Sequence, residues 1–125
     1  MTKAEIQEAS GASVSDGVVN AGNKSVCDYK VGNTGSVIGI MLVDKAPGES
    51  ADKMVAELKK RKINAQIAPG IGDGAYTSAP GYGMQQLGAY KGSKHVIVTV
   101  MMMGAPEAKA RAVADKVARK AIGKL

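Results

Sequence analysis

The sequence predicts an α+β protein: a mainly antiparallel sheet of about five strands with helices packed against it. Apolar and polar residues alternate in several segments, as they do in strands with two different faces. Turn-forming residues such as Gly92-Ser93 join consecutive segments, and strands joined by tight turns pair antiparallel. Residues 50–62 carry apolar residues at helical spacing. The predicted order is α-β-β-α-β-β-β-α, in one domain of residues 1–125.

The first helix is predicted from a capping box. The hydroxyl of Thr2 can accept a hydrogen bond from a backbone N–H of the first turn, and Glu5 can reach back to another. Gly11 suits the left-handed residue that ends such a helix. Residues 10–25 are rich in Ser, Gly and Asn and predict a long loop, in which a brief strand at Val18-Val19 stays an open alternative.

Two strands follow the loop. Residues 25–31 place Cys27, Tyr29 and Val31 on one face of a strand and polar residues mostly on the other. Residues 36–43 are apolar at nearly every position. That pattern predicts a central strand covered on both faces.

The clearest helix spans residues 50–62. Ser50 is its expected N-cap, and the basic residues of its last turn complement the helix dipole. Residues 63–68 and 75–78 are candidates for short strands.

The end of the chain predicts a hairpin and a helix. Residues 84–91 and 94–103 flank the Gly92-Ser93 turn, and every second residue of the last strand from Val96 to Val100 is valine. An Ala-rich helix starts at Pro106 and runs to about Gly123, with Val113, Val117 and Ala121 facing the sheet.

Composition narrows the class of protein. Apolar residues make up 45% of the chain, which excludes wholesale disorder, but the sequence has no Phe or Trp and seven Met. No apolar run reaches the roughly 18 residues that span a bilayer, and the start of the sequence, with its Thr-Lys-Ala-Glu opening, does not resemble a signal peptide. We therefore expect either a cytosolic chain or a mature region that begins at a new Met.

The segment Pro69-Gly70-Ile71-Gly72-Asp73-Gly74-Ala75-Tyr76 superficially resembles a phosphate-binding loop. A dinucleotide fingerprint requires Gly-x-Gly-x-x-Gly between a strand and a helix. Here the spacing is Gly-x-Gly-x-Gly, and a strand-like Ala-Tyr-Thr follows. The segment therefore predicts a structural turn, with Asp73 capping nearby N–H groups.

No catalytic residue, cofactor or metal ligand is predicted, and we do not expect an enzyme. His95 is the only histidine, and we expect it to be either hydrogen-bonded or exposed to solvent on its strand. Cys27 is the only cysteine, and we expect it to be a buried apolar filler. The run Met101-Met102-Met103 cannot converge on one copper ion, because successive strand residues point to opposite faces.

The net charge of +6 leaves several partners open. Nucleic-acid-binding proteins usually combine such charge with stacking aromatics or a recognised motif, and neither is evident, so nucleic acid is the less favoured partner. Solvated helix faces are the default interpretation. Peripheral contact with an anionic membrane surface is a secondary one. The clusters are Lys59, Lys60, Arg61 and Lys62, and then Lys109, Arg111, Lys116, Arg119, Lys120 and Lys124.

The order of short motifs resembles a known group of proteins. A Cys27-Asp28-Tyr29 strand, the segment from Pro69 to Tyr76 and a Lys91-Gly92 hairpin occur in sequence, after a Thr-Lys-Ala-Glu opening. This combination resembles the small exported lipoproteins and sensor-like domains of unknown function of many bacteria, over nearly the whole chain. The resemblance implies a periplasmic or extracellular location and no catalytic residues, and it leaves open a lipid anchor on the native precursor.

One feature departs from that group. Its members often pair the strand cysteine with another cysteine near the N-terminus, and Cys27 has no second cysteine in this sequence. The resemblance therefore implies either that the disulfide is absent or that a partner or lipid-attachment cysteine lies upstream of Met1.

The leading hypothesis is a non-catalytic binding or accessory module of the bacterial cell envelope. Its partner is expected to be a protein or an envelope polymer, contacted through one sheet face or through residues 79–86. The residues proposed for binding are Tyr76, Tyr82, Met84 and Gln85. The alternative function is a cytosolic basic nucleic-acid-binding protein, and the third hypothesis is a small enzyme that uses His95. The sequence indicates neither the ligand nor the oligomeric state.

Overall fold

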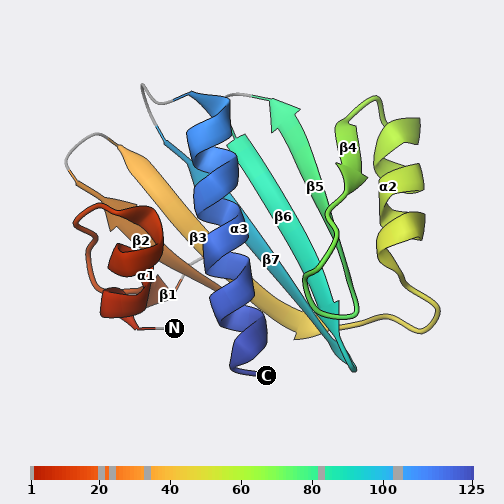
Figure 1. Ribbon diagram of the computed structural model, residues 1–125, viewed down its shortest axis with the longest axis horizontal. Helices are drawn as coiled ribbons and strands as arrows, with labels where there is room; N and C mark the ends of the chain where they lie inside the picture. Colours follow the sequence, from red (N-terminus) through yellow and green to blue (C-terminus); the bar gives the residue numbers. More distant parts are fainter. Residues whose placement is uncertain (1, 20–21, 23–24, 33–34, 82–83, 103–105) are drawn as a thin grey trace.

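The computed structural model describes residues 2–19, 22, 25–32, 35–81, 84–102 and 106–125 of the chain, apart from the side chain of Pro80. Within these residues the chain forms three helices and seven strands (Figure 1). In chain order they are α1 (Lys3–Ser10), β1 (Val18–Val19), β2 (Val26–Val31), β3 (Ser36–Asp44), α2 (Ala51–Lys60), β4 (Asn64–Ile67), β5 (Gly74–Gly81), β6 (Met84–Lys91), β7 (Lys94–Met101) and α3 (Glu107–Gly123).

The seven strands form one sheet in the order β1-β2-β3-β7-β6-β5-β4. Every pair of neighbours is antiparallel. β7 is the central strand, and its pairing with β3 extends from Val37 opposite Met101 to Asp44 opposite Lys94. Between β3 and β4 the chain crosses to the far edge of the sheet, and α2 lies in this crossing.

The structure confirms an α+β fold with an antiparallel sheet and corrects its details. The prediction of about five strands in the order α-β-β-α-β-β-β-α is wrong, because the described chain has seven strands in the order α-β-β-β-α-β-β-β-β-α. The predicted order counts three strands after the second helix, although four segments there are strand candidates, and it omits the open alternative at Val18-Val19. β1 has only two residues, both exposed, and β4 carries the exposed Asn64 and Gln66. Such strands depend on pairing with a neighbour, which a local hydrophobic pattern does not report.

One face of the sheet is covered by α1 and α3 and contains the main core (Figure 1). Val98 and Val100 of β7 are fully buried there. Val113 and Val117 of α3 belong to the same cluster, as predicted. Each aliphatic side chain buried in this way contributes about 1.5–3 kcal/mol to folding.

The opposite face is covered only in part. Val55 of α2 packs against Ala65, Tyr76 and Tyr90 of β4, β5 and β6 in a second, smaller cluster. Over β2, β3 and β7, no helix of the described chain covers this face. The prediction that residues 36–43 are covered on both faces is therefore wrong for this side of β3.

The local signals at the helix ends are confirmed. The Oγ1 atom of Thr2 accepts a hydrogen bond from the N–H of Glu5 at 3.2 Å, and the N–H of Thr2 donates to the carboxylate of Glu5 at 2.8 Å. Gly11 ends α1 in the left-handed region with a φ of 69°. The hydroxyl of Ser50 accepts from the N–H of Lys53 at the start of α2. α3 begins at Glu107, one residue later than predicted.

The glycine-rich segment 69–76 is a turn that leads into β5, as predicted. A carboxylate oxygen of Asp73 accepts a hydrogen bond from the N–H of Gly92 at 2.7 Å, and the N–H of Asp73 donates to the carbonyl of Tyr90. A Cβ on Gly72 would lie 2.4 Å from that same carbonyl oxygen. These contacts hold the turn against the β6–β7 hairpin, and no helix follows at which a phosphate could bind.

None of the described helices combines the length and the apolar character needed to cross a membrane.

Candidate functional site

The uncovered part of the sheet forms a groove of about 630 Å³. Its floor comes from strands β2, β3, β7 and β6, and α2 supplies residues of one wall. Four methionines line it, Met41, Met54, Met84 and Met101, so we call it the methionine groove. Four aliphatic side chains also line it: Val26, Val37, Leu58 and Ile97, the last on the central strand β7.

Two glycines shape the floor of the methionine groove. A Cβ on Gly39 would lie 2.9 Å from a carboxylate oxygen of Asp28, so the Asp28 side chain lies over this glycine. A Cβ on Gly88 would lie 2.2 Å from the Cζ atom of Tyr76. The Tyr76 ring therefore packs directly on the backbone of β6, a position that only glycine allows.

A short polar strip crosses the floor between the apolar residues. The hydroxyl of Ser78 donates to the side-chain oxygen of Gln86 at 3.4 Å, and the side-chain amide of Gln86 donates to the hydroxyl of Thr99 at 3.2 Å. Gln86 and Thr99 both line the groove, together with Asp28. The groove is therefore a mainly apolar surface with a few polar groups at fixed positions.

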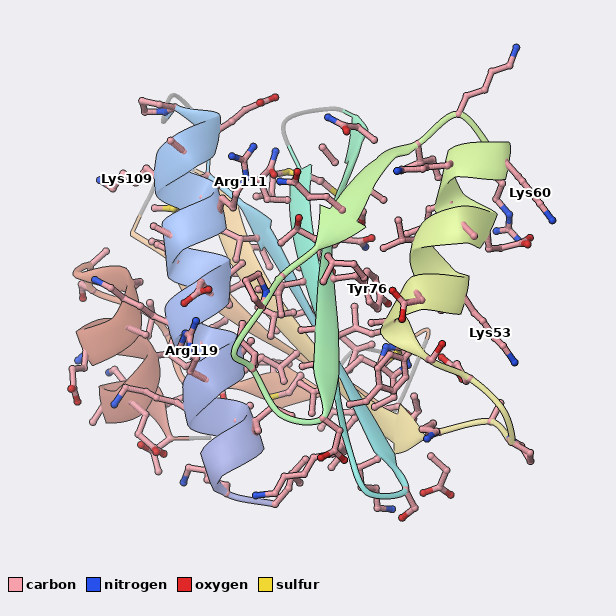
Figure 2. The ribbon with its side chains drawn as sticks, turned by 45° about the vertical axis from the view of Figure 1, so that its right-hand side comes forward. Lys53, Lys60, Tyr76, Lys109, Arg111 and Arg119 are labelled. Carbon is pink, nitrogen blue, oxygen red and sulfur yellow. The ribbon has the colours of Figure 1, made fainter. Side chains whose placement is uncertain are left out.

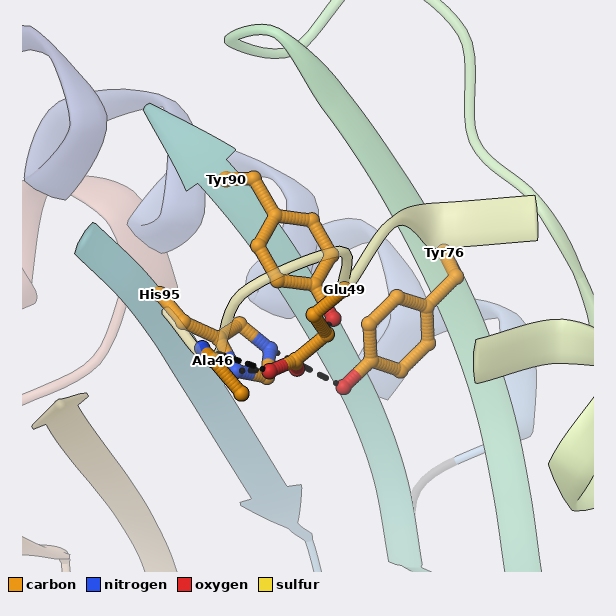
Figure 3. A network of polar contacts seen from close by, with 5 residues as sticks. All are labelled: Ala46, Glu49, Tyr76, Tyr90 and His95. Carbon is orange, nitrogen blue, oxygen red and sulfur yellow. Dashed lines mark hydrogen bonds and ion pairs between the residues drawn. The ribbon is translucent and has the colours of Figure 1, made fainter. Parts of the chain in front are cut away.

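A network of polar side chains lies beside the groove, under the start of α2. The Oη atom of Tyr90 donates to the carboxylate of Glu49 at 2.6 Å, and the Nδ1 atom of His95 lies 3.3 Å from the same carboxylate. The hydroxyl of Tyr76 lies 3.1 Å from the Nε2 atom of His95. Figure 3 shows Glu49 between the three rings, with the backbone N–H of Ala46 as a further donor to it. We call these five residues the tyrosine–histidine network.

Burial sets the protonation state of the network. It raises the pKa of Tyr76 to about 12 and that of Tyr90 further still, and it lowers the pKa of His95, which the charge of Glu49 partly offsets. The hydrogen bond from Tyr90 is the main cause of the lowered pKa of Glu49. At neutral pH the network therefore contains a charged carboxylate, a neutral imidazole and two neutral phenols.

The contacts of His95 also define its tautomer. Because an ionised carboxylate can only accept hydrogen bonds, Nδ1 carries the proton and donates to Glu49. Nε2 then accepts from the hydroxyl of Tyr76. Of the two alternatives for this histidine, the structure shows the buried, hydrogen-bonded one, with both ring nitrogens engaged. The network joins the loop before α2 to three strands of the sheet.

The four residues proposed for binding lie in different places. Tyr76 and Met84 both line the methionine groove. Gln85, which follows Met84 on β6, points to the opposite face and is buried. Tyr82 lies outside the described residues. From residues 79–86, Gln86 also lines the groove.

The sulfur-containing residues divide between the faces as their strand positions predict. Met101 lines the groove, whereas Met102 packs against the main core. Met103 lies outside the described residues. Cys27 is partly buried against the main core, in line with the role of a small apolar filler.

Eight of the seventeen basic residues belong to two helices, α2 and α3, on opposite faces of the sheet. Figure 2 shows Lys53 and Lys60 on α2 at one side of the molecule and Lys109 and Arg119 on α3 at the other. Several basic residues are engaged in ion pairs: Arg61 with Glu57, Arg119 with Asp115, Lys120 with Glu8, and Lys124 with Glu5. Each pair is partly exposed, so it contributes about 1 kcal/mol or less to stability.

Sequence reasoning missed most of the groove. Met41, Met54 and Ile97 come from β3, α2 and β7, and only the sheet order brings them together. The sequence shows that residues 36–43 are apolar on both faces, which predicts that both faces are covered. In the structure one of these apolar faces is left open by the described chain. No sequence pattern pairs Glu49 with His95.

Within the described ranges, no group of three or more His, Cys, Asp or Glu side chains could hold a metal ion. Comparisons of the chain with models of protein families, with curated proteins and with solved structures gave no match.

Proposed function

We propose that this chain is a non-catalytic binding module whose methionine groove takes up a small, largely apolar molecule. As part of the same proposal we place the module in the bacterial cell envelope, where the resemblance of its motifs to exported lipoproteins and sensor-like domains would put it. The observation that carries the binding proposal is the groove of about 630 Å³ on the open sheet face.

The size and chemistry of the groove support a small apolar ligand. Sites for small molecules usually measure about 300–1,000 Å³ and are lined by apolar side chains with a few fixed polar groups. The groove has this volume and this lining, and α2 rises beside it so that the surface is concave. Methionine side chains adapt to ligands of different shape, which suits a site that accepts a range of apolar molecules.

The tyrosine–histidine network supports a role without catalysis. Both ring nitrogens of His95 are engaged, and the hydroxyl of Tyr76 is held by His95 with a pKa of about 12. A general base needs a free acceptor and a pKa near the working pH. The imidazole of His95 has no free acceptor, so we assign the network to holding α2 in place as the wall of the groove.

The binding proposal can be tested with the neutral apolar dye Nile red, whose fluorescence rises in an apolar site. We expect saturable binding of one dye per chain. Ile97→Gln places an amide on the groove floor, and we expect it to weaken dye binding by about tenfold or more.

The matched control is Leu42→Gln. Leu42 lies on the neighbouring strand β3, is already exposed and does not line the groove, so dye affinity should change by about twofold at most. Equal loss of binding in both variants, or no saturable binding to the unaltered chain, would contradict the proposal. Dimers seen by sedimentation that disappear with Ile97→Gln would also contradict it, because a second copy would then cover the groove.

The location needs a separate measurement. Fractionation of the cells that naturally make the protein should find it outside the cytoplasm. Recovery with the cytoplasmic proteins would remove the envelope location and leave the binding proposal standing.

A further inference from the structure

A second, much smaller pocket lies on the face of the sheet that α3 covers. It measures about 50 Å³ and is lined by residues of β4, β5 and β6 and by Arg111 of α3. Gln85, Thr77 and Gln66 contribute polar side chains to it. We call it the Gln85 pocket. It shares no lining residue with the methionine groove on the opposite face.

Gln85 at this pocket has an unsatisfied donor. Its side chain is 2% exposed, and its Nε2 atom has no hydrogen-bond partner among the residues that the structure describes. Leaving a buried amide donor unpaired costs free energy, so such groups are rare in folded proteins and point to a partner from outside the chain.

The charge of the pocket indicates the nature of that partner. The eight lining residues include the positive Arg111 and no Asp or Glu. Arg111 extends from α3 toward the sheet (Figure 2). Two acids of α3, Glu107 and Asp115, lie one turn before and after Arg111 and outside the pocket, and Asp115 is paired with Arg119 at 2.6 Å. A guanidinium and an amide N–H₂ both donate hydrogen bonds, so the pocket favours an anionic acceptor.

The volume limits the size of the anion. About 50 Å³ is the space of one or two water molecules, so a ring does not fit. The two oxygens of a carboxylate need about this space, and they can accept from Arg111 and Gln85 together. We propose that the Gln85 pocket binds the carboxylate group of a small organic acid.

Sodium acetate is the simplest probe of this site. In a ¹H–¹⁵N NMR titration, at an ionic strength held constant with sodium chloride, the side-chain N–H₂ signals of Gln85 should shift and saturate. Arg111→Gln should raise the dissociation constant for acetate by about tenfold or more, because it removes the charged donor. Lys116→Gln is the matched control, since it removes one positive charge from the same helix outside the pocket, and it should leave acetate binding unchanged.

Gln85→Met tests the other donor. It replaces the amide with an apolar side chain of similar length, so the protein should stay folded while acetate binding is lost. Three results would overturn the proposal: Gln85 signals that do not saturate with acetate, the same shift with chloride alone, or saturable binding of methylammonium in place of acetate. None of these results bears on Nile red binding in the methionine groove, so the two proposals fail separately.

Discussion

Gly88→Ala is the sharpest test of how the sheet supports Tyr76. A Cβ at this position would lie 2.2 Å from Cζ, 2.4 Å from Cε1 and 2.4 Å from Oη of Tyr76. Ordinary carbon contacts measure about 3.5–4.0 Å, so the ring would have to move by more than about 1 Å. That movement would break the 3.1 Å contact between Tyr76 and His95.

The cost of Gly88→Ala has two parts. Overpacking in a well-packed cluster costs about 1–3 kcal/mol. A buried His95 nitrogen left without a partner costs about 1–3 kcal/mol more. We therefore expect the free energy of unfolding, measured by urea denaturation followed by circular dichroism, to fall by about 2–6 kcal/mol.

Two controls identify the cause. Gly39→Ala, in β3 on the same face of the sheet, meets the end of the Asp28 side chain at 2.9 Å and no ring, so its effect should be smaller. In a Tyr76→Ala background, Gly88→Ala should cost almost nothing, because the ring that it strikes is gone. If Gly88→Ala is equally costly with and without the Tyr76 ring, the argument from this contact is refuted.

Two further predictions concern the β6–β7 hairpin and the pH dependence of stability. Gly72→Ala should lower the free energy of unfolding in urea by about 3 kcal/mol or more, because its Cβ would meet the Tyr90 carbonyl oxygen at 2.4 Å. The control Gly92→Ala has a similar positive φ but open space around the Cβ, so it should cost only about 1–2 kcal/mol. Equal costs of the two substitutions would contradict the role of the contact with Tyr90. Because the pKa of His95 is lowered from 6.5, its stabilising contribution is present above that pH and is lost as the pH falls toward the folded-state pKa. The free energy of unfolding should therefore decrease as the pH falls below about 6.5, and an unchanged slope in His95→Gln would contradict the assignment.

The sequence predicts the covered face of this fold well, because the signals there are local. Alternating valines in β7, the apolar face of α3 and the caps of α1 each report their own environment. The edge strands β1 and β4 give weaker signals, since their exposed residues are ordered by pairing with β2 and β5. The sequence therefore offers residues 18–19 only as an open alternative and residues 63–68 only as a candidate, although both segments form strands.

The candidate site is hardest to predict because its residues meet only through the sheet order. The crossing between β3 and β4 carries Glu49 over the sheet to His95 and places Met54 beside the groove. Tyr76 and Met84 were predicted as binding residues from their segment alone. Gln85 was grouped with them because strand neighbours are adjacent in sequence, yet the alternation of side chains places it in a different pocket on the other face.

The tyrosine–histidine network links the stability of the fold to the shape of the groove. Tyr90 does not line the groove. Its hydroxyl donates a hydrogen bond of 2.6 Å to Glu49, which directly precedes Ser50, the N-cap of α2. Tyr90→Phe leaves the ring and removes this bond, so we expect a loss of about 1–3 kcal/mol in urea denaturation.

If the network positions α2 as the wall of the methionine groove, Tyr90→Phe should also weaken Nile red binding at concentrations of denaturant where the variant remains folded. The control is Arg61→Gln, which removes the exposed ion pair with Glu57 at the other end of α2 and should change neither measurement appreciably. Unchanged dye affinity in folded Tyr90→Phe would show that the network stabilises the fold without shaping the groove. The anchoring role would then belong to the packing of Val55 and Tyr76 alone, with the polar contacts of Glu49 as a consequence of that packing.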